Sequence, residues 1–149
     1  MILKNCWSSI VVLSRALIQE CAAANVGSEI EFMDWEAHAN TPELPNMDLI
    51  GPSAMTVTEH SKELITVSFA IGVSTFTGDK NLFRQRDYVA RVFERLRPEN
   101  KIIYFDAESA SEKSVLVITD GTMAAPMSKS ESRPWQYVQC EALLVPVGL

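Results

Sequence analysis

The clearest pattern in the chain is the alternation of apolar and small or polar residues across positions 64–76. Apolar side chains occupy every second position there: Ile65, Val67, Phe69, Ile71 and Val73. A period of two is typical of a β-strand with one buried face. Residues 54–59 precede this run across the polar turn 60–63, so the two segments together predict a long β-hairpin.

Two other segments show the three- and four-residue spacing of amphipathic helices. In residues 3–24 the apolar positions form a wide stripe, and Asn25 and Gly27 end it. A wide stripe indicates a helix that is deeply buried or that contacts two partners. Residues 81–97 predict a second helix, ended by Pro98. Its apolar stripe consists of Leu82, Val89, Val92, Phe93 and Leu96.

The remaining chain divides into short apolar runs and unpatterned segments. The short runs predict strands at 29–36, 101–106, 114–119 and 135–145. The proline-rich residues 37–53 and residues 122–134 lack such patterning, and we expect a loop and an arm that are mobile or contact a partner. The order of elements predicts a single α+β domain over 1–149. Its mainly antiparallel sheet would carry the N-terminal helix and the central helix on one face.

Charge and composition narrow the classes of protein that this domain can belong to. The 149 residues carry a net charge of −6, and a surface that grips nucleic-acid phosphates needs clustered Lys and Arg instead. An acidic balance suits simple solubility, and it also suits a surface that DNA passes without specific binding. Three cysteines without paired spacing favour a reducing compartment. We find neither a signal-peptide pattern nor an apolar run of membrane-spanning length.

No motif for catalysis, for cofactor binding or for metal binding stands out. His38 and His60 fall in a loop and a turn, where a general base has no held position. Neither Gly51-Pro-Ser-Ala-Met nor Gly72-Val-Ser-Thr-Phe has the second glycine of a nucleophile elbow. Nucleotide-binding glycine motifs are missing from the sequence. We therefore expect no catalytic residues, no cofactor and no metal.

The second predicted helix is basic, although the chain as a whole is acidic. Arg84, Arg91 and Arg95 share a helical face with Asp87. Such a face is either solvated, with internal ion pairs of small energetic value, or a docking surface for an acidic neighbour such as the next subunit. The sequence leaves both interpretations open.

The arm and the start of the last strand supply the other candidate interface residues, which are Lys129, Arg133 and Trp135. Tryptophan and arginine are enriched among the residues that contribute most to protein–protein binding. The alternative for Trp135 is a place in the core.

Three short segments and the order of elements point to a known family. The segments are Thr75–Leu82, which leads into a helix ending at Arg97-Pro98, then Val117–Gly121, and finally Arg133–Val138. They follow an amphipathic opening helix, a Trp-containing strand and a proline-rich loop ahead of a long hairpin. Over nearly the whole chain, this plan resembles the tail terminator proteins of long-tailed bacteriophages.

The resemblance implies a structural virion protein, not an enzyme. Such a protein forms a ring, expected to be a homohexamer, on the finished tail tube, where it ends polymerisation and joins the tail to the head. The implied partners are copies of itself, the tail tube protein and the neck or connector proteins. DNA would pass through the lumen without specific binding, and no membrane is involved. Assembly would take place in the host cytoplasm, and the final location would be the tail or neck of the virion.

A closed ring needs a head-to-tail interface, so each subunit must carry two different, complementary surfaces. The arginine-bearing helix and an acidic loop are candidates for these surfaces. Two other functions stay open from the sequence: another neck or head-completion ring of a phage, and a small α+β enzyme.

Overall fold

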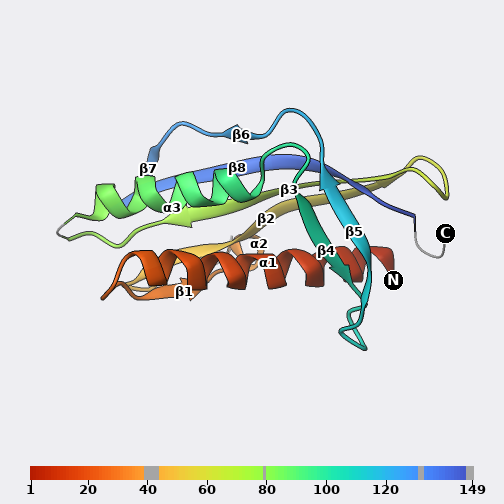
Figure 1. The fold of residues 1–149 in the computed structure, drawn as a ribbon. Coiled ribbons are helices and arrows are strands. Elements are labelled where there is room, and N and C mark those ends of the chain that lie inside the picture. Colours follow the sequence, from red (N-terminus) through yellow and green to blue (C-terminus); the bar gives the residue numbers. More distant parts are fainter. Residues whose placement is uncertain (39–43, 79, 131–132, 147–149) are drawn as a thin grey trace.

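The computed structural model describes residues 1–38, 44–78, 80–130 and 133–146. The helices are α1 (Ile2–Ala24), α2 (Trp35–His38) and α3 (Asn81–Arg95). The strands are β1 (Ile30–Phe32), β2 (Asp48–Glu59), β3 (Ile65–Ser74), β4 (Lys101–Phe105), β5 (Glu112–Ile118), β6 (Met123–Ala124), β7 (Ser128–Ser130) and β8 (Arg133–Leu144). They form one sheet in the order β1-β2-β3-β8-β5-β4, with β6 and β7 also paired to β8 (Figure 1). Because only β1 and β2 pair in parallel, the predicted α+β class with a mainly antiparallel sheet is confirmed.

The long hairpin is the centre of the sheet. β3 pairs with β2 on one side and, along its whole length from Ile65 to Ser74, with residues 135–144 of β8 on the other. The first strand of the hairpin, β2, starts at Asp48, six residues before the predicted start at residue 54. Pro52 is tolerated inside it because the backbone oxygen of Ile50 faces β1, where it accepts from the Met33 N–H. The backbone of Pro52 therefore faces the same side, beyond the end of β1, and no bond to β3 is lost.

Both long helices pack on one face of the sheet, as predicted. The apolar positions of β3, the even positions of β8 and the buried stripes of α1 and α3 join in one core cluster. Figure 1 shows the two helices lying antiparallel to each other. Within the described part of the chain, none of the helices is both long and apolar enough to span a bilayer.

The opposite face of the sheet is covered near its middle by α2, which corrects the predicted strand at 29–36. That strand ends at Phe32, and Trp35 begins a helical turn instead. The Asp34 carboxylate accepts the N–H groups of Glu36 and Ala37 at 3.1 Å, which caps the turn. The Trp35 indole then lies against Gly72 and donates to its carbonyl at 3.1 Å.

The two segments predicted as loop and arm contain more regular structure than expected. Residues 37–53 include the end of α2 and the start of β2, while 39–43 lie outside the described residues. In the segment 122–134, β6 and β7 pair with β8, and 131–132 are again outside the description. Periodicity missed these strands because two or three residues are too few to show a pattern. Whether either segment contacts a partner remains a prediction.

Candidate assembly surface

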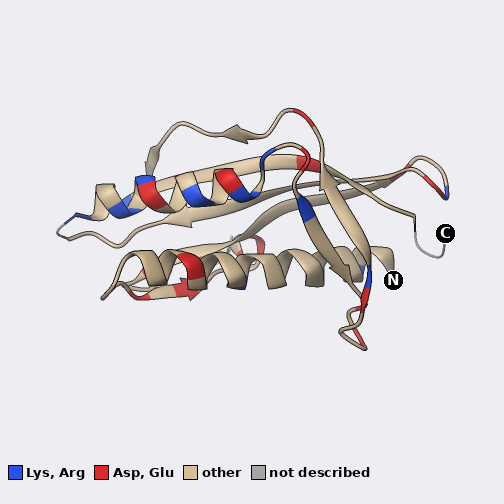
Figure 2. Cartoon of the chain, in the orientation of Figure 1, with Lys and Arg blue, Asp and Glu red and all other residues tan. Residues whose placement is uncertain are grey.

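The central helix α3 presents three different faces. Its buried face consists of Gln85, Tyr88, Val89 and Val92. One flank turns toward α1. The outward face is exposed and repeats at three- and four-residue spacing, with Phe83, Arg86, Ala90 and Glu94 along it. Figure 2 shows the alternating basic and acidic bands that result along this helix.

Arg84, the first of the candidate arginines, serves inside the subunit. Its guanidinium contacts the carboxylate of Asp48 at 2.9 Å, and that carboxylate is 2% exposed. The Tyr88 hydroxyl donates to the same carboxylate at 2.7 Å, and the Phe76 N–H donates to it at 2.9 Å. Burial, followed by smaller effects that include the hydrogen bond to Asp48, raises the pKa of Tyr88, so the phenol stays protonated as a donor. This network fixes the start of β2 to α3.

The flank of α3 that holds the other three candidates is paired with α1. Asp87 accepts from Arg91 at 3.0 Å and from the Asn25 side chain at 2.7 Å. Arg91 and Arg95 approach the Glu20 carboxylate at 3.9 and 4.0 Å. These contacts match the interpretation of a face with internal ion pairs, and a role of Asp87, Arg91 and Arg95 between subunits stays a prediction.

Arg133 is 4% exposed and acts as a clamp within the chain. Its guanidinium donates to the Ser74 hydroxyl at 2.9 Å and to the backbone oxygens of Pro45 and Met47 at 2.8 and 2.6 Å. It therefore holds the segment before β2 against the end of β3. Such a buried position makes Arg133 a structural residue of the subunit.

Trp135 lies on the face of the sheet opposite the long helices. Its ring packs edge-on against Trp35 with 6.2 Å between centroids, and Tyr137 lies 5.4 Å away on its other side. The three aromatic rings are half-buried, so Trp135 has neither a fully buried core position nor a fully exposed one. The backbone of Lys129 pairs with Pro134 in the β7–β8 hairpin, and its side chain lies outside the description.

Sequence reasoning missed two residues of the outward face of α3, Phe83 and Arg86. Phe83 is 66% exposed, and no ion pair joins Arg86 to any described residue. The predicted apolar stripe included Leu82, which is exposed in the structure, and left out the buried Tyr88. A stripe drawn through Tyr88 and Val92 would have placed Phe83 and Arg86 on the outside.

Metal ligands and thiols are two kinds of reactive group that the described residues could supply. No three of their His, Cys, Asp or Glu side chains are grouped so as to hold a metal ion. The thiols of Cys6, Cys21 and Cys140 are buried. Burial raises the pKa of Cys6 to about 11 and is the main reason why the pKa values of Cys21 and Cys140 rise to about 12. Such thiols are protonated at neutral pH and are poor nucleophiles.

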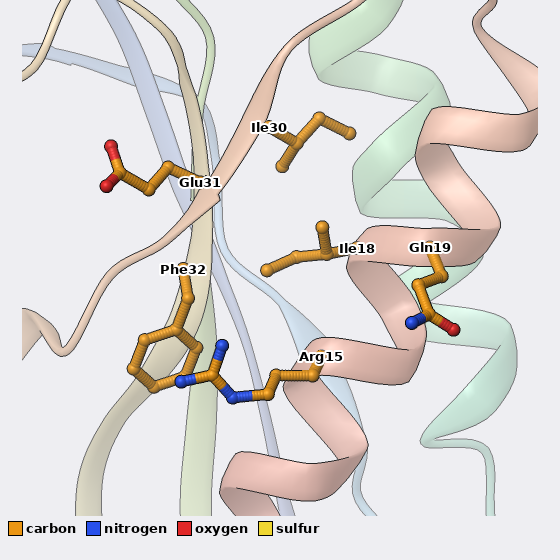
Figure 3. Close-up of a pocket in the computed structure, with 6 residues that line it drawn as sticks. All are labelled: Arg15, Ile18, Gln19, Ile30, Glu31 and Phe32. Atoms are coloured by element: carbon orange, nitrogen blue, oxygen red, sulfur yellow. The ribbon is translucent and has the colours of Figure 1, made fainter.

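An open hollow lies between α1 and the edge strand β1 (Figure 3). Ile18 of α1 and Ile30 and Phe32 of β1 form its apolar walls. The Arg15 guanidinium stacks over the Phe32 ring at 4.5 Å from its centroid, whereas the Glu31 side chain points away from α1. The hollow is wide open and without convergent polar groups, so it fits a protruding side chain better than a small substrate.

Comparisons with known proteins leave the family open. No protein-family model matches the sequence, and no curated protein is similar to it. One matching solved structure, of a protein whose name gives no function, superposes with a TM-score of 0.48. It covers 89% of each chain at 11% identity. A likeness of this degree carries no argument about function.

Proposed function

We propose that this protein is a ring-forming tail terminator of a long-tailed bacteriophage. It caps the tail tube, ends its polymerisation and joins the tail to the head. The proposal rests on the resemblance in the order of elements. It is supported by one observation above all, the open edge of strand β2.

No described strand pairs with β2 beyond Ile50 on the side of β1. The residues Gly51–Glu59 thus have no strand partner on that side. Pro52 and a bulge between Ser53 and Thr56 interrupt this edge, so its regular part is Thr56–Glu59. Soluble proteins usually cover or interrupt such an edge, because its unpaired N–H and C=O groups recruit other chains. Strand addition by a neighbouring subunit is a common way of using it. In Figure 1 the β2–β3 hairpin reaches the end of the molecule where the N-terminus lies, in a position to meet a neighbour.

The described residues also lack the arrangement that an enzyme of this size needs. His60 lies in the exposed hairpin turn. Among the described residues, its one hydrogen-bond partner is the Thr66 hydroxyl, 3.1 Å from the ring Nε2. The most deeply buried carboxylate, Asp48, is saturated by Arg84, Tyr88 and the Phe76 N–H. A carboxylate held in this way joins β2 to α3 and to the segment after β3, which is a structural role.

The oligomeric size of the protein and its location on tail tubes test the proposal. Light scattering and negative-stain images should show rings of the purified protein, or rings at one end of tail tubes mixed with it. Addition of the protein to growing tubes should stop their elongation at substoichiometric amounts relative to tube subunits. A protein that stays monomeric at every concentration and never joins tubes refutes the proposal. Labelling inside assembled virions separates a terminator at the tube end from another neck or head-completion ring.

A further inference from the structure

Charge is unevenly distributed over this subunit. Residues 80–101 hold seven Lys or Arg and three Asp or Glu, a net +4 in a chain whose total is −6. Four of these cations, Arg84, Arg91, Arg95 and Arg97, have carboxylate partners within the subunit. Arg86, on the exposed outward face of α3, has no such partner among the described residues. It is therefore available to an acidic surface of another molecule.

A second surface of the subunit is acidic and has no cationic partner among the described residues. Residues 29–36 contain Glu29, Glu31, Asp34 and Glu36 and no cation. Within the described chain, none of these carboxylates has a Lys or Arg within salt-bridge distance. Glu29, Glu31 and Glu36 are exposed. They lie before, in and after β1, the edge strand of the sheet, and we refer to residues 29–36 as the acidic edge.

Glu31 and the outward face of α3 lie on different sides of α1, whereas Glu29, at the start of the acidic edge, lines a hollow together with Arg84 of α3. On one side, Arg15 of α1 stacks over Phe32 of β1. On the other, Glu20 of α1 faces Arg91 and Arg95 of α3. Five residues separate Arg15 from Glu20, which is about 140° around a helix of 3.6 residues per turn. Two complementary surfaces that face different directions are what a head-to-tail interface requires.

The outward face of α3 and the region around the acidic edge are also complementary in their apolar groups. Phe83 protrudes from α3 one turn before Arg86, with the exposed Leu82 beside it. The hollow between α1 and β1 has apolar walls and an arginine over its aromatic floor. A helix that crosses the β1 edge would therefore place Phe83 in the hollow and Arg86 on the Glu31 side of the strand. An aromatic ring near Arg15 also gains a cation–π contact.

We propose that a second copy of this chain docks the outward face of its α3 across the acidic edge. Arg86 of one copy pairs with Glu31 of the next, and Phe83 enters the hollow between α1 and β1. The interface repeats head-to-tail around the ring. This inference rests on the proposed ring and specifies which surfaces close it.

The test is a charge swap between Arg86 and Glu31. Arg86→Glu alone and Glu31→Arg alone each place like charges at every interface. We expect either variant to need at least about tenfold more protein for half-assembly. The double variant Arg86→Glu/Glu31→Arg restores opposite charges and should assemble like the wild type. Lys113→Glu, the same change at an exposed residue of β5, is the matched control and should assemble normally.

A mixture of the two single variants gives a second readout. Copies that alternate around an even-numbered ring have opposite charges at every interface, so an equimolar mixture should recover assembly that neither variant shows alone. Circular dichroism should show the same fold for all variants, because Arg86 and Glu31 are exposed and unpaired. Phe83→Ala should weaken assembly in the same assay without lowering the thermal midpoint.

The possible results separate this inference from the proposed function. If the wild type forms rings and both single variants form them equally well, the docking surface is wrong while the ring remains. If the single variants lose assembly but the double variant does not regain it, the pairing of Arg86 with Glu31 is also wrong. If the wild type neither assembles nor joins tubes, the proposed function itself fails, and this inference fails with it.

Discussion

The buried carboxylate of Asp48 should be one of the largest single contributors of a polar side chain to stability. It is 2% exposed and accepts hydrogen bonds from Arg84, Tyr88 and the Phe76 N–H. These three donors come from α3 and from the segment after β3, so one side chain ties three parts of the chain together. We therefore take Asp48→Ala as the most informative perturbation of the fold.

The expected loss follows from what the substitution leaves behind. Removing one partner of a buried ion pair costs about 3–5 kcal/mol, because the other charge stays without compensation. The Arg84 side chain is 19% exposed, so water partly replaces the lost carboxylate and the lower end of this range applies. A loss of about 3 kcal/mol lowers the thermal midpoint of a domain of this size by roughly 6–12 °C.

Urea unfolding followed by far-UV circular dichroism measures this loss directly. Glu63→Ala, in the exposed hairpin turn, is the matched control and should change the free energy of unfolding by less than about 0.5 kcal/mol. A double-mutant cycle with Tyr88→Phe should give a coupling of about 1 kcal/mol. If Asp48→Ala costs no more than the control, the network contributes nothing to stability and the reasoning is refuted.

Three further predictions concern the core, the α2 contact and the thiols. Phe69 is 1% exposed in the core, so Phe69→Ala should cost about 3–5 kcal/mol in urea unfolding, and a value near zero would contradict its burial. In Gly72→Ala the new Cβ would lie 2.6 Å from the Trp35 indole nitrogen, so we expect a loss of about 1–3 kcal/mol with a changed near-UV spectrum. The pKa of Cys140 is raised from 9.0 to about 12, so the unfolded chain releases this proton first. The contribution of this thiol to stability should be constant below about pH 8 and be lost as the pH rises above 9. Cys140→Ala should therefore reduce the slope of stability against pH in that range by about 1.4 kcal/mol per pH unit, and an unchanged slope would show that this thiol is not protected.

Elements with a long, regular pattern were predictable from the sequence. The alternation in β3 identified its buried face correctly, because that strand lies between two neighbours and its core positions must be apolar. The stripe of α1 was equally clear, since Cys6, Ile10, Leu17 and Cys21 are all buried. In both cases the local pattern and the tertiary packing agree.

The structure around Trp35 could not be predicted in this way. An imperfect alternation at 29–36 suggested a strand through Trp35. What decides the conformation is the Asp34 cap together with the close approach of the chain to β2. A Cβ on Gly51 would lie 1.6 Å from the Met33 carbonyl oxygen, so this crossing needs glycine at a position eighteen residues away in sequence. No pattern within a local window reports such a contact.

Ion pairs between distant parts of the chain could not be predicted from the sequence either. The sequence placed Arg84 on a basic face, but its partner Asp48 lies 36 residues earlier. Helical spacing shows which charges share a face and not which of them are already neutralised by another element. Only the three-dimensional arrangement distinguishes Arg84, which pairs with Asp48, from Arg86, which has no carboxylate partner among the described residues.

Phe83 lies on the same outward face of α3 as Arg86 and is also exposed. A single exposed apolar residue needs no explanation, but Phe83 lies beside the exposed Leu82 and one turn from the unpaired Arg86. α3 is anchored by its buried residues Tyr88, Val89 and Val92, whereas its outward residues are exposed. An aromatic side chain with a neighbouring arginine is also the composition favoured at the centre of protein interfaces. The proposed docking of α3 across the acidic edge would account for the composition of this outward face, for which the packing of the isolated subunit gives no reason.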